Sequence, residues 1–230
     1  MHGQRVVLIT GAKGGLGSFV TQAFLAAGDT VAGVSRSISP DDFPNPRFAA
    51  MPADLTDLAA ARRLAEQVVR RFRRVDALIH VMGGFAGGQP IPETGDDIWE
   101  RMLSLNLRAA VNTFRAVIPH MRAAGGGRIV AVASRAAVEP AANIAAYAAS
   151  KAALLSLVRS AALENQDAGI TANTILPGTM NTEANRKADP RADASRWVPP
   201  EDVAQLAVFL VSDAAAQITG AAIPVYGREA

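Results

Sequence analysis

Short apolar runs alternate along the chain of 230 residues with longer stretches in which apolar residues recur every three or four positions. The runs predict buried strands at residues 6–10, 30–34, 47–52, 75–81, 128–133, 170–176 and 218–226. The periodic stretches predict helices at about residues 16–27, 57–72, 96–123, 147–169 and 200–212. Strands that alternate with helices favour an α/β fold, a Rossmann-type doubly wound parallel sheet of about seven strands with helices on both faces. Because half of the residues are hydrophobic, we expect one domain over residues 1–230.

Composition narrows the functional classes. The chain has no cysteine, which excludes disulfides, thiolate chemistry and a cysteine-based zinc site, and we expect no metal. Its 23 basic and 21 acidic residues give a net charge of +2 without a basic stripe, so we expect no nucleic-acid partner. No apolar stretch approaches the roughly 20 residues of a membrane span. We therefore expect a cytoplasmic protein that does not enter the membrane.

A glycine-rich turn joins the first predicted strand to the first predicted helix. Its pattern is Gly11-x-x-x-Gly15-Leu16-Gly17, with Lys13 inside the turn. Glycines allow the backbone to approach a pyrophosphate, and the N-terminus of the following helix stabilises its negative charge. The sequence therefore predicts a dinucleotide site here, with a turn that binds no ligand as the alternative.

The end of the second strand bears on the choice of dinucleotide. An acidic residue there would bind the ribose hydroxyls of NAD, but this chain has Ser35 and Arg36. A guanidinium can bind a 2′-phosphate through paired hydrogen bonds, and Lys13 could add a second cation. We therefore prefer NADP, with NAD possible and a solvated Arg36 as the alternative. Asp54, after the third strand, could accept from the adenine amino group, whereas Thr56 or Asp57 would cap the next helix.

Two further segments lie at predicted carboxyl ends of strands. Residues 82–88 contain four glycines, among them Gly83 and Gly84, and such a loop suits close approach to a ribose or nicotinamide. A plain mobile loop is the alternative. Residues 183–196 are rich in charge and are typical of a lid over a cleft. His80 is predicted to be a buried strand residue rather than a base.

Ser134, Tyr147 and Lys151 are the candidate catalytic residues. Tyrosine and lysine four positions apart lie on one face of a helix. A free phenol ionises near pH 10, and an adjacent ammonium would lower that pKa, which needs a shift of roughly three units to reach neutrality. Such a phenol can exchange a proton with a substrate oxygen, and the Ser134 hydroxyl could bind the same oxygen. By itself the pair is more typical of a surface tyrosine with an ordinary neighbour, and the other motifs reverse that preference.

Taken together and in this order, these motifs resemble the short-chain dehydrogenase/reductase family over essentially the whole chain. The resemblance implies that Tyr147 donates and accepts the proton and that Lys151 lowers its pKa and binds the nicotinamide ribose. Ser134 would hold the substrate oxygen, and Asn106 a proton-relay water. The resemblance further implies three sets of cofactor contacts: Asp54 and Leu55 around adenine, Pro177 and Gly178 at the end of the sixth strand, and Thr179 or Thr182 at the carboxamide. A homotetramer or homodimer is the expected assembly.

The chain also departs from the family pattern. His80-Val81-Met82-Gly83 stands where the family usually has Asn-Asn-Ala-Gly, so the stabilising contact of the asparagine is expected to be lost. The loops at 83–88 and 185–197 are similar to those of dihydropteridine reductase, which lacks the serine and prefers NADH through an acidic residue. Because this chain has Ser134 and Arg36, the loop similarity does not transfer the substrate.

Three functional hypotheses follow. The first is an NADP-dependent enzyme that interconverts a carbonyl and an alcohol on a small-molecule substrate by hydride transfer, with the tyrosine as general acid and base. The second is an NAD(P)H-dependent reductase of a quinonoid dihydropterin-like ring, which needs no serine. The third is a non-catalytic regulator that senses a dinucleotide.

Overall fold

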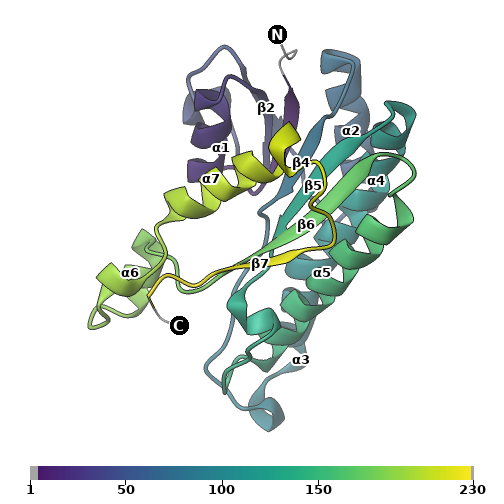
Figure 1. Cartoon of the computed structure of the whole chain (residues 1–230). Coiled ribbons are helices and arrows are strands. Elements are labelled where there is room, and N and C mark those ends of the chain that lie inside the picture. Colours follow the sequence, from purple (N-terminus) through teal and green to yellow (C-terminus); the bar gives the residue numbers. More distant parts are fainter. Residues whose placement is uncertain (1–4, 229–230) are drawn as a thin grey trace.

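Seven strands and seven α-helices make up most of the computed structural model, which describes residues 5–228 (Figure 1). The strands are β1 Val6–Thr10, β2 Thr30–Ser35, β3 Phe48–Pro52, β4 Ala77–His80, β5 Gly127–Val132, β6 Ile170–Pro177 and β7 Ala222–Val225. The helices are α1 Gly17–Ala26, α2 Leu58–Phe72, α3 Asp96–Leu103, α4 Ala109–Ala123, α5 Ala145–Glu164, α6 Glu183–Ala188 and α7 Pro200–Leu210. All strand pairs are parallel, in the order β3, β2, β1, β4, β5, β6, β7, which confirms the predicted sheet.

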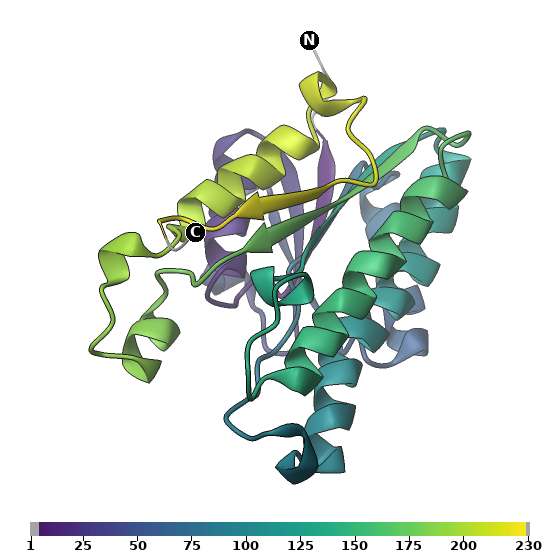
Figure 2. The same ribbon diagram turned by 60° about the horizontal axis from the view of Figure 1, so that its bottom comes forward.

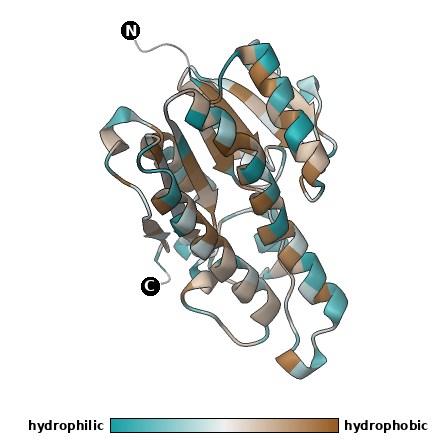
Figure 3. Ribbon diagram, turned by 90° about the vertical axis from the view of Figure 1, so that its right-hand side faces the viewer, coloured by the Kyte–Doolittle hydropathy of each residue, from teal (hydrophilic) through white to brown (hydrophobic). Residues whose placement is uncertain are grey.

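Helices cover both faces of the sheet (Figure 2). On one face, α1 and α7 pack through residues such as Phe24 and Val203. On the other, α2, α4 and α5 pack through residues such as Leu64, Phe114 and Leu154. Figure 3 shows the consequence: the strands are mostly hydrophobic, and the helices that flank them mix hydrophobic with hydrophilic residues. Burial of apolar surface on both faces explains why the strands read as continuous apolar runs in the sequence.

The strand order changes direction between β1 and β4. From β1 the chain builds outward to β3, then returns to the other side of β1 and continues to β7. At the carboxyl end of this pair, Thr10 of β1 is in register with His80 of β4. In open α/β sheets, ligands bind at the crevice outside such a reversal. The fold therefore brings the loops after β1, β2 and β4 together at one edge.

Several boundaries differ from the sequence predictions. The helix expected at 96–123 contains a π-helical segment, Ser104–Arg108, between α3 and α4. The last strand is shorter than expected, and the charged segment 183–196 holds the short helix α6 and a 3₁₀ turn at Ala194–Arg196. A second 3₁₀ turn, Pro40–Asp42, lies in the proline-rich loop after β2. Within residues 5–228, no helix combines the length and apolar character that crossing a membrane requires.

Candidate active site

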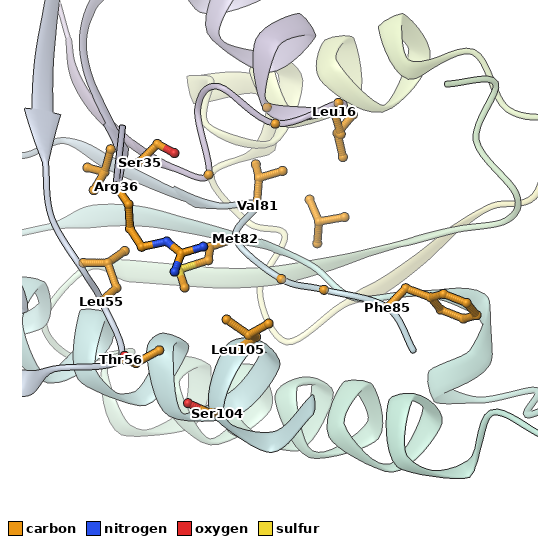
Figure 4. Close-up of a pocket in the computed structure, with 18 of the residues that line it drawn as sticks. Leu16, Ser35, Arg36, Leu55, Thr56, Val81, Met82, Phe85, Ser104 and Leu105 are labelled. Atoms are coloured by element: carbon orange, nitrogen blue, oxygen red, sulfur yellow. The ribbon is translucent and has the colours of Figure 1, made fainter. Parts of the chain in front are cut away.

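A cleft of about 760 Å³ lies at the carboxyl edge of the sheet (Figure 4). Most of the predicted site residues line it: Gly11, Gly15, Leu16, Gly17, Ser35, Arg36, Asp54, Leu55, Gly83, Gly84, Tyr147 and Lys151. The predicted residues outside its lining are Lys13, Asn106, Ser134, Pro177, Gly178, Thr179 and Thr182. The cleft is also lined by residues that were not predicted to belong to the site, among them Arg101, Ser104, Leu105 and Met180. Ser104, Leu105 and Met180 lie within two positions of a predicted residue, whereas nothing in the sequence pattern pointed to Arg101.

The glycine turn after β1 forms one wall of the cleft. Gly11 has φ +68°, and a side chain there would lie 2.9 Å from the backbone nitrogen of Met82. A side chain at Gly17 would overlap the carbonyl of Gly11. No side chain caps the N-terminus of α1, although the Ser18 amide already donates to the Gly14 carbonyl at 2.9 Å. These observations fit a pyrophosphate against the backbone and the helix N-terminus.

The two predicted phosphate-binding cations are placed differently. The Lys13 ammonium is 2.8 Å from an Asp42 carboxylate oxygen and 3.3 Å from the Ser37 carbonyl, so it is already paired. Among residues 5–228, no hydrogen bond or ion pair is found for the Arg36 guanidinium, which extends into the cleft (Figure 4). Asp54 lies near enough for the Arg36 charge to contribute to lowering its carboxyl pKa. Arg36 is thus the cation that this wall of the cleft offers to a ligand.

Of the two acidic residues after β3, Asp57 caps the next helix and Asp54 lines the cleft. Asp57 caps α2, since its carboxylate accepts from the amides of Ala59 and Ala60 at 2.9 and 3.2 Å. Asp54 accepts from the amide and hydroxyl of Thr56, and these bonds are the main cause of its lowered pKa. Asp54 therefore stays ionised at the cleft wall, as an acceptor with part of its capacity already used.

The segment after β6 also reaches the carboxyl edge. Gly178 donates its amide to the carbonyl of Val225, which ties the segment to β7. The Thr182 hydroxyl caps α6 through the amide of Asn185, and its methyl carbon would lie 3.8 Å from a side chain at Gly15. Pro177 ends β6 itself. The segment thus stands opposite the glycine turn, but these side chains do not line the cleft in this structure.

Asn106 holds the second glycine loop from the π-helical segment. Its side-chain oxygen accepts from the Gly84 amide at 2.8 Å, and its side-chain nitrogen donates to the Gly84 carbonyl at 3.0 Å and to Ser150 Oγ at 2.9 Å. A side chain at Gly83 would lie 2.6 Å from the Asn106 oxygen and 3.1 Å from Lys151 Nζ. Only glycine fits between these two polar groups, which explains the glycine at this position.

Lys151 is buried on α5 directly below this loop. Its ammonium donates to the carbonyl of Val132 at 3.0 Å, and burial lowers its pKa to about 8. Ser134 follows β5, where its hydroxyl accepts from the Ala136 amide at 3.2 Å and forms a side-chain hydrogen bond with Tyr147. Tyr147 and Lys151, in the first two turns of α5, therefore line the cleft, and Ser134, after β5, adjoins it through its hydrogen bond with Tyr147.

The electrostatics of Tyr147 differ from the sequence expectation. Burial raises the pKa of its phenol, the hydrogen bond with Ser134 opposes that shift, and Lys151 contributes no shift. The prediction that the ammonium brings this pKa toward neutrality is therefore wrong for the structure described here. The spacing of four residues correctly placed Tyr147 and Lys151 on one face of a helix. It could not show that the Lys151 ammonium donates to a backbone carbonyl. The phenol is consequently protonated at neutral pH.

Two aromatic neighbours complete the site. Phe85 lies with its ring 5.0 Å from that of Tyr147 at an angle of 72°, and 64% of its surface is exposed. His80 is fully buried, and burial together with the Lys151 charge lowers its pKa to about 3. His80 is therefore a neutral strand residue, as predicted. The exposed Phe85 ring leaves an apolar surface next to the Tyr147 ring.

Comparison with known proteins agrees with this geometry. The family model for short chain dehydrogenases matches residues 5–193. A short chain dehydrogenase of Penicillium rubens, adrF, is 32% identical over 241 residues, which cover 96% of this chain and 94% of the relative. A 3-ketoacyl-(acyl-carrier-protein) reductase from Brucella melitensis, solved with NADH, has a TM-score of 0.88 and 28% identity over 98% of both chains. ElxO, solved with NADP, has a TM-score of 0.92 over 97% of this chain, and at 24% identity it shows the fold alone.

Proposed function

The chain belongs to the short-chain dehydrogenase/reductase family, and from this membership we propose that it is an NADP-dependent enzyme that interconverts a carbonyl and an alcohol. At the coarser level it is an NAD(P)-dependent oxidoreductase that acts on CH–OH or carbonyl groups. The observation that carries the finer proposal is that Tyr147 and Lys151 line the cleft and that Ser134 is hydrogen-bonded to Tyr147. A small-molecule substrate, a homodimer or homotetramer and a cytoplasmic location remain predictions.

When bound, the dinucleotide supplies a hydride to the carbonyl carbon or takes one from the alcohol carbon. In reduction, the carbonyl oxygen becomes an alkoxide and takes the phenolic proton of Tyr147. The phenol of Tyr147 holds its proton at neutral pH, as this direction requires. Ser134 offers a second donor to the same oxygen, so developing negative charge meets two hydroxyl groups. In oxidation the same proton returns to Tyr147.

The preference for NADP rests on Arg36. Its guanidinium extends into the cleft beside Asp54 and Ser35, without an ion pair among residues 5–228. A planar guanidinium matches the oxygens of a 2′-phosphate, and a charge-assisted bond of this kind is worth about 1.5–3 kcal/mol. The related structures hold NADP in one case and NADH in another, so they support a nicotinamide dinucleotide without choosing between the two.

Phe85 favours a second candidate, the reduction of a quinonoid dihydropterin-like ring. Its exposed ring, edge-on to Tyr147, is a surface on which a flat substrate ring could stack. Such a reaction needs no donor at Ser134, since no oxyanion forms at a ketone oxygen. The two candidates therefore differ in their dependence on that serine.

The experiment is a panel of ketones, aldehydes and quinonoid dihydropterins, followed by loss of NADPH absorbance with NADH in parallel. On the best substrate, Ser134→Ala is compared with Ser156→Ala, a matched change at an exposed position of α5. The carbonyl mechanism predicts a fall in kcat of about 100-fold or more for Ser134→Ala, the usual effect of removing an oxyanion donor. A fall below about threefold, with Ser156→Ala unchanged, would reject the carbonyl mechanism and leave the pterin-like one.

A further inference from the structure

His80 carries an unused chemical group in the middle of the sheet. Both Thr10 at the end of β1 and His80 at the end of β4 are fully buried and in register. The Thr10 hydroxyl oxygen is 3.0 Å from Nδ1 of His80, whereas Nε2 has no hydrogen-bond partner among residues 5–228. The edge of the Phe114 ring system lies near the imidazole instead, with centroids 6.2 Å apart at 83°. The unpaired Nε2 atom is destabilising, because a buried polar atom without a partner costs free energy. The hydrogen bond that His80 makes through Nδ1 therefore calls for a functional explanation.

The neighbouring hydrogen bonds determine where the imidazole proton lies. The Met82 amide donates to the Thr10 hydroxyl oxygen at 3.2 Å. If His80 Nδ1 also donated to that oxygen, the hydroxyl proton would be left in a buried site without an acceptor. If Nδ1 accepts instead, the hydroxyl proton has a partner and the bonds run in one direction, from Met82 through Thr10 to His80. This tautomer leaves only the Nε2–H group unpaired among residues 5–228, whereas the other leaves both Nε2 and the hydroxyl proton unpaired, so the arrangement favours a neutral imidazole protonated at Nε2.

The loop that begins this chain of bonds is part of the cleft. Residues 81–84 line it, and Met82 passes within 2.9–3.0 Å of where a side chain at Gly11 would begin. Val81 also donates its amide to the Thr10 carbonyl at 3.3 Å. Thr10 thus holds the loop after β4 against the glycine turn after β1, with one bond from its backbone and one from its side chain. A displaced Met82 would enter the space available to a dinucleotide.

We propose that His80 is a positioning residue for dinucleotide binding: by accepting the Thr10 hydroxyl proton, it orients the oxygen that holds the Met82 amide and so fixes the loop at the cleft wall. His80 does not touch the reacting atoms and transfers no proton. Its side chain gives this strand end a polar contact of its own, where the sequence led us to expect that such a contact was lost. The inference concerns binding of the dinucleotide and does not depend on which substrate is reduced.

The first test is the tautomer in the free wild-type protein, read by ¹⁵N NMR of histidine-labelled chain. The sequence has three histidines, and the spectrum of His80→Asn identifies the signal that belongs to His80. We expect a neutral ring protonated at Nε2 across pH 6–8, consistent with the buried environment. A ring protonated at Nδ1, or a cationic ring, would overturn the proposal without any measurement of activity.

The second test compares variants by NADPH and NADH fluorescence titration without substrate. His80→Leu removes the acceptor, whereas His80→Asn places an amide oxygen near the position of Nδ1. Because leucine leaves the Thr10 hydroxyl without its acceptor, we expect His80→Leu to raise the Kd of the dinucleotide about tenfold. Hydrogen exchange of the Met82 amide should also become faster. His80→Asn should restore both within about twofold, and Thr10→Ser should bind more tightly than Thr10→Val.

The outcomes separate positioning from stability alone. If His80→Leu unfolds more readily but the folded protein binds the dinucleotide as tightly as His80→Asn does, His80 is only structural and the proposal fails. If His80→Leu does not fold, the proposal is tested by the tautomer of the wild-type protein and by the comparison of Thr10→Ser with Thr10→Val. Loss of activity with intact dinucleotide binding in Ser134→Ala would bear on the proposed reaction and leave this inference untouched.

Discussion

Replacing Lys151 by methionine gives the prediction with the clearest magnitude. The side chain is almost fully buried, with 5% of its surface exposed, and within residues 5–228 its ammonium makes one hydrogen bond, to the carbonyl of Val132. Burial without a carboxylate partner lowers its pKa from 10.5 to about 8. Methionine keeps the unbranched length of the side chain and removes the charge. The substitution should abolish turnover and at the same time remove a pH-dependent destabilisation.

The sign and size of the effect follow from proton linkage. Between pH 8 and 10.5 the unfolded chain keeps a proton on Lys151 that the folded chain has released, so the stability of the wild type rises with pH in this range. A shift of about 2.5 units corresponds to about 3 kcal/mol, most of it reached by pH 10. The lost hydrogen bond to Val132 adds an offset of about 1 kcal/mol that does not vary with pH.

The assay is urea unfolding of the wild type and Lys151→Met at pH 7, 8, 9 and 10. Other titrating groups are common to both proteins, so their contributions cancel in the difference. We expect the free energy of unfolding of the wild type, minus that of the variant, to increase by about 2–3 kcal/mol from pH 7 to pH 10. A difference that stays constant within about 0.5 kcal/mol would refute the buried, unpaired ammonium on which the site description depends.

Three other predictions concern the dinucleotide. Arg36→Ala should raise the Kd of NADPH by about 10–100-fold and leave that of NADH within about twofold in fluorescence titration, and equal losses would remove the case for NADP. Asp42→Asn releases the glycine-turn lysine from its ion pair, so NADPH should bind several-fold more tightly, while Asp41→Asn, a matched change in the same 3₁₀ turn, should have no effect. Gly83→Ala places a methyl group 2.6 Å from the Asn106 side-chain oxygen. It should therefore weaken binding of both dinucleotides; unchanged affinity would show that the loop can move aside.

The sheet and its helices could be predicted from the sequence because burial determines both patterns. Strands covered by helices on both faces must be apolar throughout, and β1 and β6 are buried along their whole length. The grouping of Ser134 with Tyr147 and Lys151 followed from a strand end and a helical spacing of four, which are local properties of the chain.

Features that depend on distant residues could not be predicted. The π-helical segment around Asn106 lies within one continuous helical pattern, and its bonds go to Gly84 and Ser150, far along the chain. The pairing of Lys13 with Asp42 needed the path of the proline-rich loop. The raised pKa of Tyr147 results from burial, whereas the sequence indicated only the neighbouring charge.

The central claim is that the Tyr147 hydroxyl carries the proton, and Tyr147→Phe tests it most directly. The variant removes one oxygen and keeps the ring that contacts Phe85. With the best substrate from the panel, turnover should fall by about 100-fold or more, as expected when a general acid is removed. NADPH affinity, measured on the same sample, should stay within about twofold. Turnover within about threefold of the wild type, with NADPH still bound, would contradict the account.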